Sequence, residues 1–237
     1  MATTAVITTP DGKMPLYDVE PDGTARGAVI VVQEAFGVNG HIEDVTRRFA
    51  AEGYRAVSPH LFYRTGDPVI GYGDYGLILP HFEALSEKGL LGDIDATLAH
   101  LESAGLARSR TGIVGFCMGG AVTFLAALRR RLGAGVTFYG GGVAQSRFGI
   151  PPHIELAPEL QTPWLGLYGD LDQSIPVDEV EQLRAAVSHA HVPTEVVRYA
   201  EAGHGFHCDA RDGYVEAAAR DAWRRTLEWF GQYLVAE

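Results

Sequence analysis

The stretch GIVGFCMGG, residues 112–120, places a cysteine between glycines where an apolar run meets a segment with helical periodicity. The pattern Gly115-x-Cys117-x-Gly119 is typical of the sharp strand-to-helix turn that presents a nucleophile. The thiol then lies near a helix N-terminus, whose partial positive charge favours the thiolate. The backbone N–H of Met118 points to the same place and is a candidate oxyanion donor. Cys117 is therefore a candidate nucleophile for acyl transfer.

Two other interpretations of this cysteine are open. Free cysteines are among the most often buried residue types, and glycine-rich turns are common, so the Cys117 thiol could simply fill space. A redox role together with Cys208, the other of two cysteines, is the second alternative, although the chain has no C-x-x-C motif. Catalytic partners would favour the nucleophile.

Two later segments supply such partners. LYGDLDQSIP places Asp172 just past one apolar run, and YAEAGHGFH places His204 between glycines past another. The order nucleophile, acid, histidine suits a carboxylate that orients an imidazole, which in turn activates the nucleophile. The alternatives are a helix cap for Asp172 and an ordinary loop position for His204. A metal cluster of His204, His207 and Asp209 is disfavoured, because no further ligand has a suitable spacing, and we expect neither metal nor cofactor.

The elements that must position these residues alternate along the chain. Apolar and β-branched runs predict strands at residues 5–9, 27–33, 54–59, 111–116, 133–140, 163–169 and 195–200. Amphipathic segments between them predict helices at residues 41–53, 92–105 and 213–235. This alternation predicts an α/β fold, with a mostly parallel central sheet and helices on both faces.

Residues 64–92 interrupt the alternation, because glycines, tyrosines and prolines break any period there. An irregular insertion of this length in a compact domain is more often functional than idle. We therefore expect one domain over residues 1–237, with residues 64–92 as a lid or pocket wall. A simple surface excursion is the alternative.

Composition narrows the class of partner. The 237 residues are 46% hydrophobic, enough for one well-buried domain, and the net charge of -11 opposes nucleic-acid binding. The sequence shows neither a basic segment followed by an apolar one at its start nor 18 consecutive apolar residues. We expect a cytoplasmic protein that acts on a small molecule away from membranes. Both a monomer and a homodimer are compatible with this composition.

Taken together, these segments resemble the dienelactone hydrolase family of α/β-hydrolases over nearly the whole chain. Residues 31–64, VVQEAFGVNGHIEDVTRRFAAEGYRAVSPHLFYR, are similar to the family's strand, glutamate-bearing loop, helix and next strand. GIVGFCMGG resembles its cysteine elbow, YGDLDQSIP and EAGHGFH its acid and histidine segments, and GYVEAAARDAWRRTLEWF its last helix. The resemblance implies the α/β-hydrolase fold and hydrolysis of an ester or lactone of a small molecule.

At individual residues, the resemblance implies Cys117 as the nucleophile, His204 as general base and acid, and Asp172 as its orienting carboxylate. It implies that Glu34 pairs with the resting thiol and swings away when substrate binds. A structural salt bridge or a helix cap is the alternative for Glu34. The backbone N–H of Ala35 is the implied second oxyanion donor.

The sequence departs from the family at the arginines that hold a substrate carboxylate. The residue four past His204 is Cys208, and residues 65–92 contain Lys88 but no arginine. Because an unpaired carboxylate in a partly desolvated pocket is costly, we expect a neutral or apolar substrate. A thioesterase and a catalytically silent binding protein are the alternatives. The candidate pocket residues are Phe36, Arg64, Tyr72, Tyr75 and Phe206.

Overall fold

The apolar runs of the sequence become the strands of one eight-stranded sheet in the computed structural model, which describes residues 2–234. The strand order is β1-β2-β4-β3-β5-β6-β7-β8. β2 is antiparallel to β1 and β4, and the other neighbours are parallel, as predicted. The strands are β1 (Ala2–Thr9), β2 (Gly12–Val19), β3 (Ala28–Val32), β4 (Arg55–Pro59), β5 (Thr111–Phe116), β6 (Ala134–Phe138), β7 (Trp164–Gly169) and β8 (Thr194–Tyr199).

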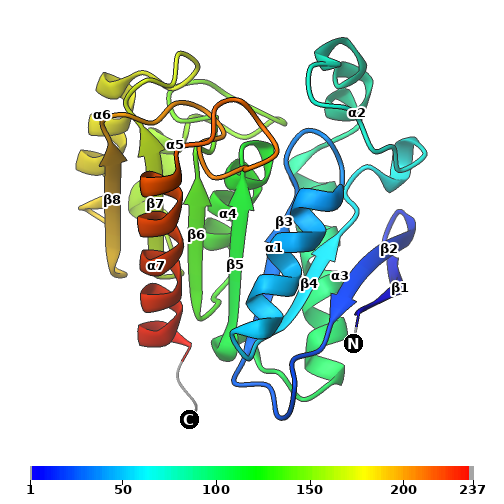
Figure 1. Cartoon of the computed structure of the whole chain (residues 1–237). Helices are drawn as coiled ribbons and strands as arrows, with labels where there is room; N and C mark the ends of the chain where they lie inside the picture. Colours follow the sequence, from blue (N-terminus) through cyan, green and yellow to red (C-terminus); the bar gives the residue numbers. More distant parts are fainter. Residues whose placement is uncertain (1, 235–237) are drawn as a thin grey trace.

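Helices cover both faces of the sheet (Figure 1). The α-helices are α1 (Gly40–Ala51), α2 (Leu79–Glu83), α3 (Glu87–Ser103), α4 (Met118–Arg129), α5 (His153–Leu156), α6 (Val177–Val187) and α7 (Glu216–Tyr233). Short 3-10 turns span Tyr63–Thr65, Tyr75–Leu77, Arg108–Arg110 and Ala157–Glu159. Helices α1 and α7 pack on one face, and α3, α4 and α6 pack on the other.

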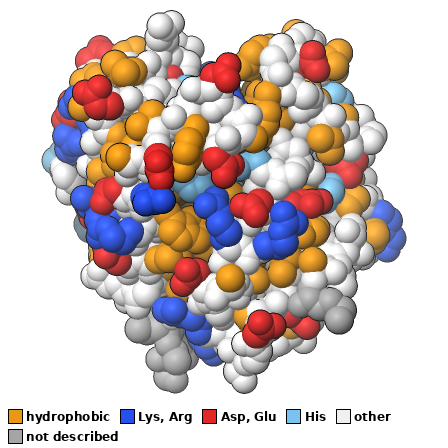
Figure 2. All heavy atoms as spheres, in the orientation of Figure 1, with side chains coloured by type: hydrophobic (Ala, Val, Ile, Leu, Met, Phe, Trp, Pro, Cys, Tyr) orange, Lys and Arg blue, Asp and Glu red, His pale blue; other side chains and the backbone are white. Residues whose placement is uncertain are grey.

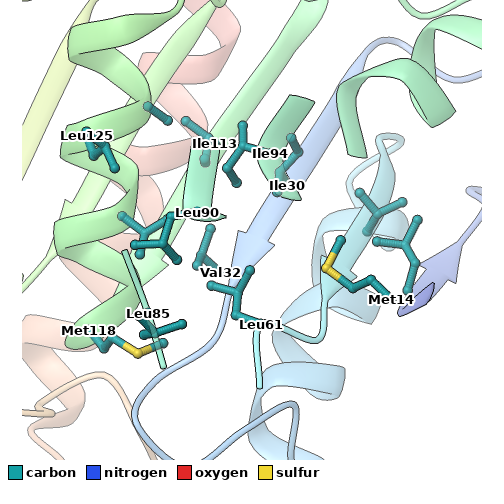
Figure 3. Close-up of a cluster of buried hydrophobic side chains, with 14 of the residues drawn as sticks. Met14, Ile30, Val32, Leu61, Leu85, Leu90, Ile94, Ile113, Met118 and Leu125 are labelled. Atoms are coloured by element: carbon teal, nitrogen blue, oxygen red, sulfur yellow. The ribbon is translucent and has the colours of Figure 1, made fainter. Parts of the chain in front are cut away.

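The pleat of the central strands divides the core between the two faces. In β3, Val29 and Val31 face α1 and α7, whereas Ile30 and Val32 face α3 and α4. Figure 3 shows the second layer, in which sheet residues lie against Leu90, Ile94 and Leu125 of the helices. On the outer surface of α1 and α7, acidic and basic side chains are interspersed (Figure 2).

One strand was missing from the sequence prediction. β2 pairs with β1 and β4 although its sequence, GKMPLYDV, contains a proline and charged residues. Pro15 is tolerated because the ladder to β4 begins only at Leu16. Asp18 is buried, and its carboxylate accepts hydrogen bonds from Arg55 at 2.7 Å and contacts His100 at 2.7 Å. A charged residue disfavours the prediction of a buried strand, and the partners that neutralise Asp18 lie far away in the sequence. The strand was therefore not predicted.

The insertion is shorter than predicted. Helix α3 begins at Glu87, where the Ser86 side chain accepts a hydrogen bond from the Gly89 N–H at 3.2 Å. Gly89 and Gly92 weaken the helical signal of this first turn, so the sequence prediction began the helix at residue 92. The insertion therefore spans residues 64–86, and it contains the short helix α2. Residue 235, included in the predicted last helix, lies outside the described residues.

Arg64 anchors the start of this segment and does not face Cys117, which corrects its predicted place in the pocket. Its guanidinium donates to Asp93 of α3 at 2.7 Å and to Asp11 of the β1–β2 turn at 2.7 Å. The Asp93 side chain is fully buried. Arg64 thus neutralises a buried carboxylate rather than binding a ligand.

Replacing Arg64→Met leaves the Asp93 carboxylate buried without its cation. We expect the free energy of unfolding, measured in urea at pH 7, to fall by about 3 kcal/mol, while ester hydrolysis by the folded protein is unchanged. Adding Asp93→Asn removes the unpaired charge and should restore part of the loss. A loss of hydrolysis without a loss of stability would instead place Arg64 in the pocket.

Candidate active site

A strained turn presents Cys117 at the end of β5. Its φ of 55° and ψ of -114° fall where a side chain is disfavoured, and it directly precedes helix α4. A Cβ on Gly115 would collide with the carbonyl of Gly119, and a Cβ on Gly119 would collide with the carbonyl of Val32. The Cys117 N–H donates to the Phe138 carbonyl at 3.1 Å. Glycines on both sides therefore make room for the turn.

Asp172 and His204 follow β7 and β8 and meet beside this turn. The Nδ1 of His204 lies 2.6 Å from Oδ2 of Asp172, whose side chain is 1% exposed. The N–H and hydroxyl of Ser174 donate to the other carboxylate oxygen at 2.8 Å and 2.7 Å. Burial, the largest effect, raises the pKa of Asp172, but the hydrogen bonds from His204 and Ser174 outweigh it and lower the pKa. The carboxylate therefore stays charged.

His204 is held as a cation between two groups. Burial, again the largest effect, lowers its pKa, yet the interactions with Asp172 and Cys117 raise the pKa to about 10. Because Nδ1 contacts Asp172, Nε2 is the ring nitrogen left for the thiol. The imidazole can thus hold a proton at Nε2 beside Sγ. The spacing of the sequence did not reveal Ser174, which fixes the far side of the carboxylate.

Two backbone N–H groups near the turn are the candidate oxyanion donors. Met118 is the first residue of α4, and Ala35 follows β3, whose end lies against Gly119. Among residues 2–234, no hydrogen bond uses the N–H of Met118 or Ala35. These free donors at the mouth of the turn suit a developing oxyanion.

Glu34 is buried beside the turn but pairs with an arginine. Its Oε1 lies 3.4 Å from a guanidinium nitrogen of Arg211, and Oε2 has no partner within the described chain. Burial raises the pKa of Glu34, and attraction to Arg211 and His204 opposes the rise. No hydrogen bond joins Glu34 to Cys117 in the described residues, so the implied pairing with the thiol is not the contact made here. Arg211 lies seven residues past His204, a position that no spacing rule indicated.

Two cavities share His204. One, of 410 Å³, is lined by Tyr72 and Tyr75 of the insertion and by Arg211. The other, of 120 Å³, contains Cys117. Its walls also include Phe82, Met118, Ala121, Gly141, Arg147, Phe148 and Ser174. The insertion thus contributes walls to both cavities.

Two predicted pocket residues lie behind the cavities instead of lining them. Phe36 is 2% exposed and packs edge-on against Tyr72 and Tyr75, with ring centroids 4.8 Å and 5.9 Å away. Phe206 is fully buried against Tyr139, at 5.3 Å. Both side chains support residues of the site from the core.

A sequence model of the family described as "Dienelactone hydrolase family" matches residues 14–234. The chain belongs to the dienelactone hydrolase family. This membership confirms the resemblance found in the sequence and the α/β-hydrolase fold, and it makes the protein a carboxylic ester hydrolase.

Similar proteins carry lactone-related names. A Salmonella typhimurium protein named "Putative carboxymethylenebutenolidase" is 43% identical over 225 residues, which cover 93% of this chain and 83% of that protein. A Bradyrhizobium protein named "Probable 2-oxo-3-(5-oxofuran-2-ylidene)propanoate lactonase" is 31% identical over 222 residues, covering 92% of this chain and 89% of that protein. A crystal structure described as "Putative Dienelactone Hydrolase from Klebsiella pneumoniae" has a TM-score of 0.90 and 38% identity, covering 98% of this chain and 99% of that chain.

The structure also shows what surrounds His207, Asp209 and Cys208 in this member of the dienelactone hydrolase family. His207 faces the buried ring of His41, with centroids 5.9 Å apart, while Asp209 lies 3.7 Å from His41. Within residues 2–234, no three His, Cys, Asp or Glu side chains are arranged to hold a metal ion. Cys117 and Cys208 are both free, and the buried Cys208 contacts the Tyr72 hydroxyl at 3.2 Å.

None of the helices within residues 2–234 has the length and apolarity to span a bilayer.

The raised pKa of His204 predicts how stability depends on pH. Because the folded value, about 10, exceeds the ordinary 6.5, His204 stabilises the fold fully below pH 6.5, and this contribution disappears as pH rises through 10. Asp172→Asn should therefore lower the free energy of unfolding by about 2 kcal/mol at pH 6, with a difference that shrinks toward pH 10. Urea unfolding of the wild type and of Asp172→Asn between pH 6 and pH 10 measures this difference.

The matched control is Asp172→Asn in a His204→Gln background, where the difference should not depend on pH. A difference of constant size in the chain that retains His204 would show that another group titrates.

Proposed function

We propose that this member of the dienelactone hydrolase family cleaves an ester or lactone of a small molecule through Cys117, His204 and Asp172. The observation that carries the proposal is the 2.6 Å contact between His204 and the buried Asp172, beside a cysteine on a strained turn. An acyl-enzyme mechanism needs a nucleophile, a base and a group that orients the base, and Cys117, His204 and Asp172 are the candidates for these three roles. The lactone-related names of its relatives support the substrate class.

The first half of the reaction forms a thioester. The thiol proton resides on Nε2 of His204 while the Cys117 sulfur attacks the substrate carbonyl. The N–H groups of Met118 and Ala35 stabilise the resulting oxyanion. When the tetrahedral intermediate collapses, Nε2 gives its proton to the departing alcohol oxygen. Asp172 keeps the ring oriented and stabilises its charge throughout.

The second half returns the enzyme to its starting state. Water attacks the Cys117 thioester, His204 takes the water proton, and the same two N–H groups hold the second oxyanion. Collapse releases the carboxylic acid, and the thiolate is again paired with the imidazolium. In a lactone, the alcohol remains tethered to the acyl group and is released in the same product.

Glu34 sets the charge balance around the thiolate. A carboxylate facing the sulfur would oppose thiolate formation, and the Arg211 guanidinium offsets that charge from the 3.4 Å contact. We assign Glu34 a modulating role in which the pair with Arg211 represents the position away from the sulfur. This leaves Cys117 to pair with His204.

Activity of cysteine variants tests the proposal. Cys117→Ala and His204→Gln should each lower kcat/KM for a p-nitrophenyl ester, a lactone and a thioester by at least about 1,000-fold, because both halves of the reaction use these groups. Cys208→Ala is the matched control and should keep the wild-type rate. The relative wild-type rates on the three substrates separate esterase from thioesterase activity. Full activity in Cys117→Ala, or none in the wild type, would contradict the mechanism.

A further inference from the structure

A short hairpin brings an arginine into the cavity of Cys117. Arg147 and Ile150 exchange backbone hydrogen bonds of 3.0 Å and 2.8 Å across a two-residue turn. Phe148 and Gly149 in that turn both have positive φ, 55° and 78°, as a type I′ turn requires. The Phe148 carbonyl also accepts a hydrogen bond from the N–H of Glu87 at 3.1 Å. The hairpin is therefore held at both its base and its tip.

A glycine makes room for the arginine side chain. A Cβ on Gly141 would lie 3.2 Å from Nε and 3.3 Å from Cζ of Arg147, closer than most Cβ contacts in proteins. Gly141 and Arg147 both line the 120 Å³ cavity that contains Cys117. The guanidinium thus rests on this bare stretch of backbone at the cavity wall.

Arg147 has no counter-ion within residues 2–234. Asp93 neutralises Arg64, and Glu34 neutralises Arg211. By contrast, no ion pair or side-chain hydrogen bond of the described chain involves Arg147. His153 behind it stays neutral, since burial and then repulsion by Arg147 lower its pKa to about 3. The chain has a net charge of -11, so acidic partners are abundant. A cation without such a partner in the cavity of Cys117 is therefore free to bind an anionic group of a ligand.

The cavity beside Arg147 is positioned to receive the acyl group. During turnover the acyl carbon is bonded to Cys117, and Cys117 lines this cavity rather than the 410 Å³ one. Phe82 and Phe148, with centroids 5.5 Å apart, supply apolar walls for a short carbon chain. The alcohol part then extends past His204 toward Tyr72 and Tyr75.

We propose that Arg147 selects substrates whose short acyl chain ends in a carboxylate. A planar guanidinium matches the two oxygens of a carboxylate, and the low-dielectric walls strengthen their attraction. The proposal rests on the proposed hydrolysis through Cys117. It replaces the expectation of a neutral substrate, because Arg147 lies in the loop between β6 and α5, outside both the insertion and the histidine loop.

A matched pair of esters tests this assignment. The 4-nitrophenyl monoester of glutaric acid carries a terminal carboxylate, and the corresponding glutaramic ester carries a neutral carboxamide of the same size. With spontaneous hydrolysis subtracted, wild-type kcat/KM should favour the carboxylate by about 10- to 100-fold, the range of a charged hydrogen bond. Arg147→Gln should abolish the preference, and Arg147→Lys should keep part of it. Arg220→Gln, on the exposed face of α7, is the control and should change nothing.

The outcomes separate this proposal from the one it rests on. Equal wild-type rates on both esters, or equal losses on both in Arg147→Gln, would overturn the role of Arg147 while leaving the hydrolase mechanism intact. A wild-type protein that hydrolyses neither these esters nor 4-nitrophenyl butyrate would overturn both. Preference for the carboxylate that falls only in Arg147→Gln supports the assignment.

Discussion

The left-handed backbone at Cys117 is the constraint around which the site is built. A residue with a side chain adopts this conformation only when its surroundings enforce it. Here the enforcement is steric, because β5, α4 and the end of β3 approach so closely that Gly115 and Gly119 leave no space for a Cβ. The turn places Cys117 at the start of helix α4 and in the wall of a cavity that Met118 also lines.

The parallel sheet brings the other groups to that sulfur. Strands β3, β5, β7 and β8 all end at the same edge (Figure 1), so residues separated by up to 177 positions, such as Glu34 and Arg211, become neighbours. Burial at this edge makes each charge depend on a partner. Asp172 remains ionised because His204 and Ser174 donate to it, and the buried Glu34 is offset by Arg211. Removing one member of such a pair costs more than the pair itself contributes.

The sequence was more informative about the candidate residues at the centre of the site than about the residues around them. Glycines and strand ends mark Cys117, Asp172 and His204 locally, so the sequence could predict them as candidates, and the fold brings them together. Strand β2 and the role of Arg64 could not, since a buried Asp18 or Asp93 reads as a surface charge until its distant partner is known. Arg147 and Arg211 were missed for the same reason: loop positions become cavity walls only through the fold. Phe36 and Phe206 were misplaced because aromatic residues next to a catalytic motif can face either the cavity or the core.

Covalent labelling with a β-lactone tests most directly whether Cys117 is the nucleophile. Ring opening of a β-lactone leaves an acyl group on the attacking atom, and an acid quench within the first turnover traps this thioester before water hydrolyses it. Peptide mass spectrometry then locates the acyl group. The mechanism predicts at most one acyl group per chain, on the peptide that contains Cys117, and none in Cys117→Ala. A trapped acyl group on Cys208, a serine or a lysine would contradict it.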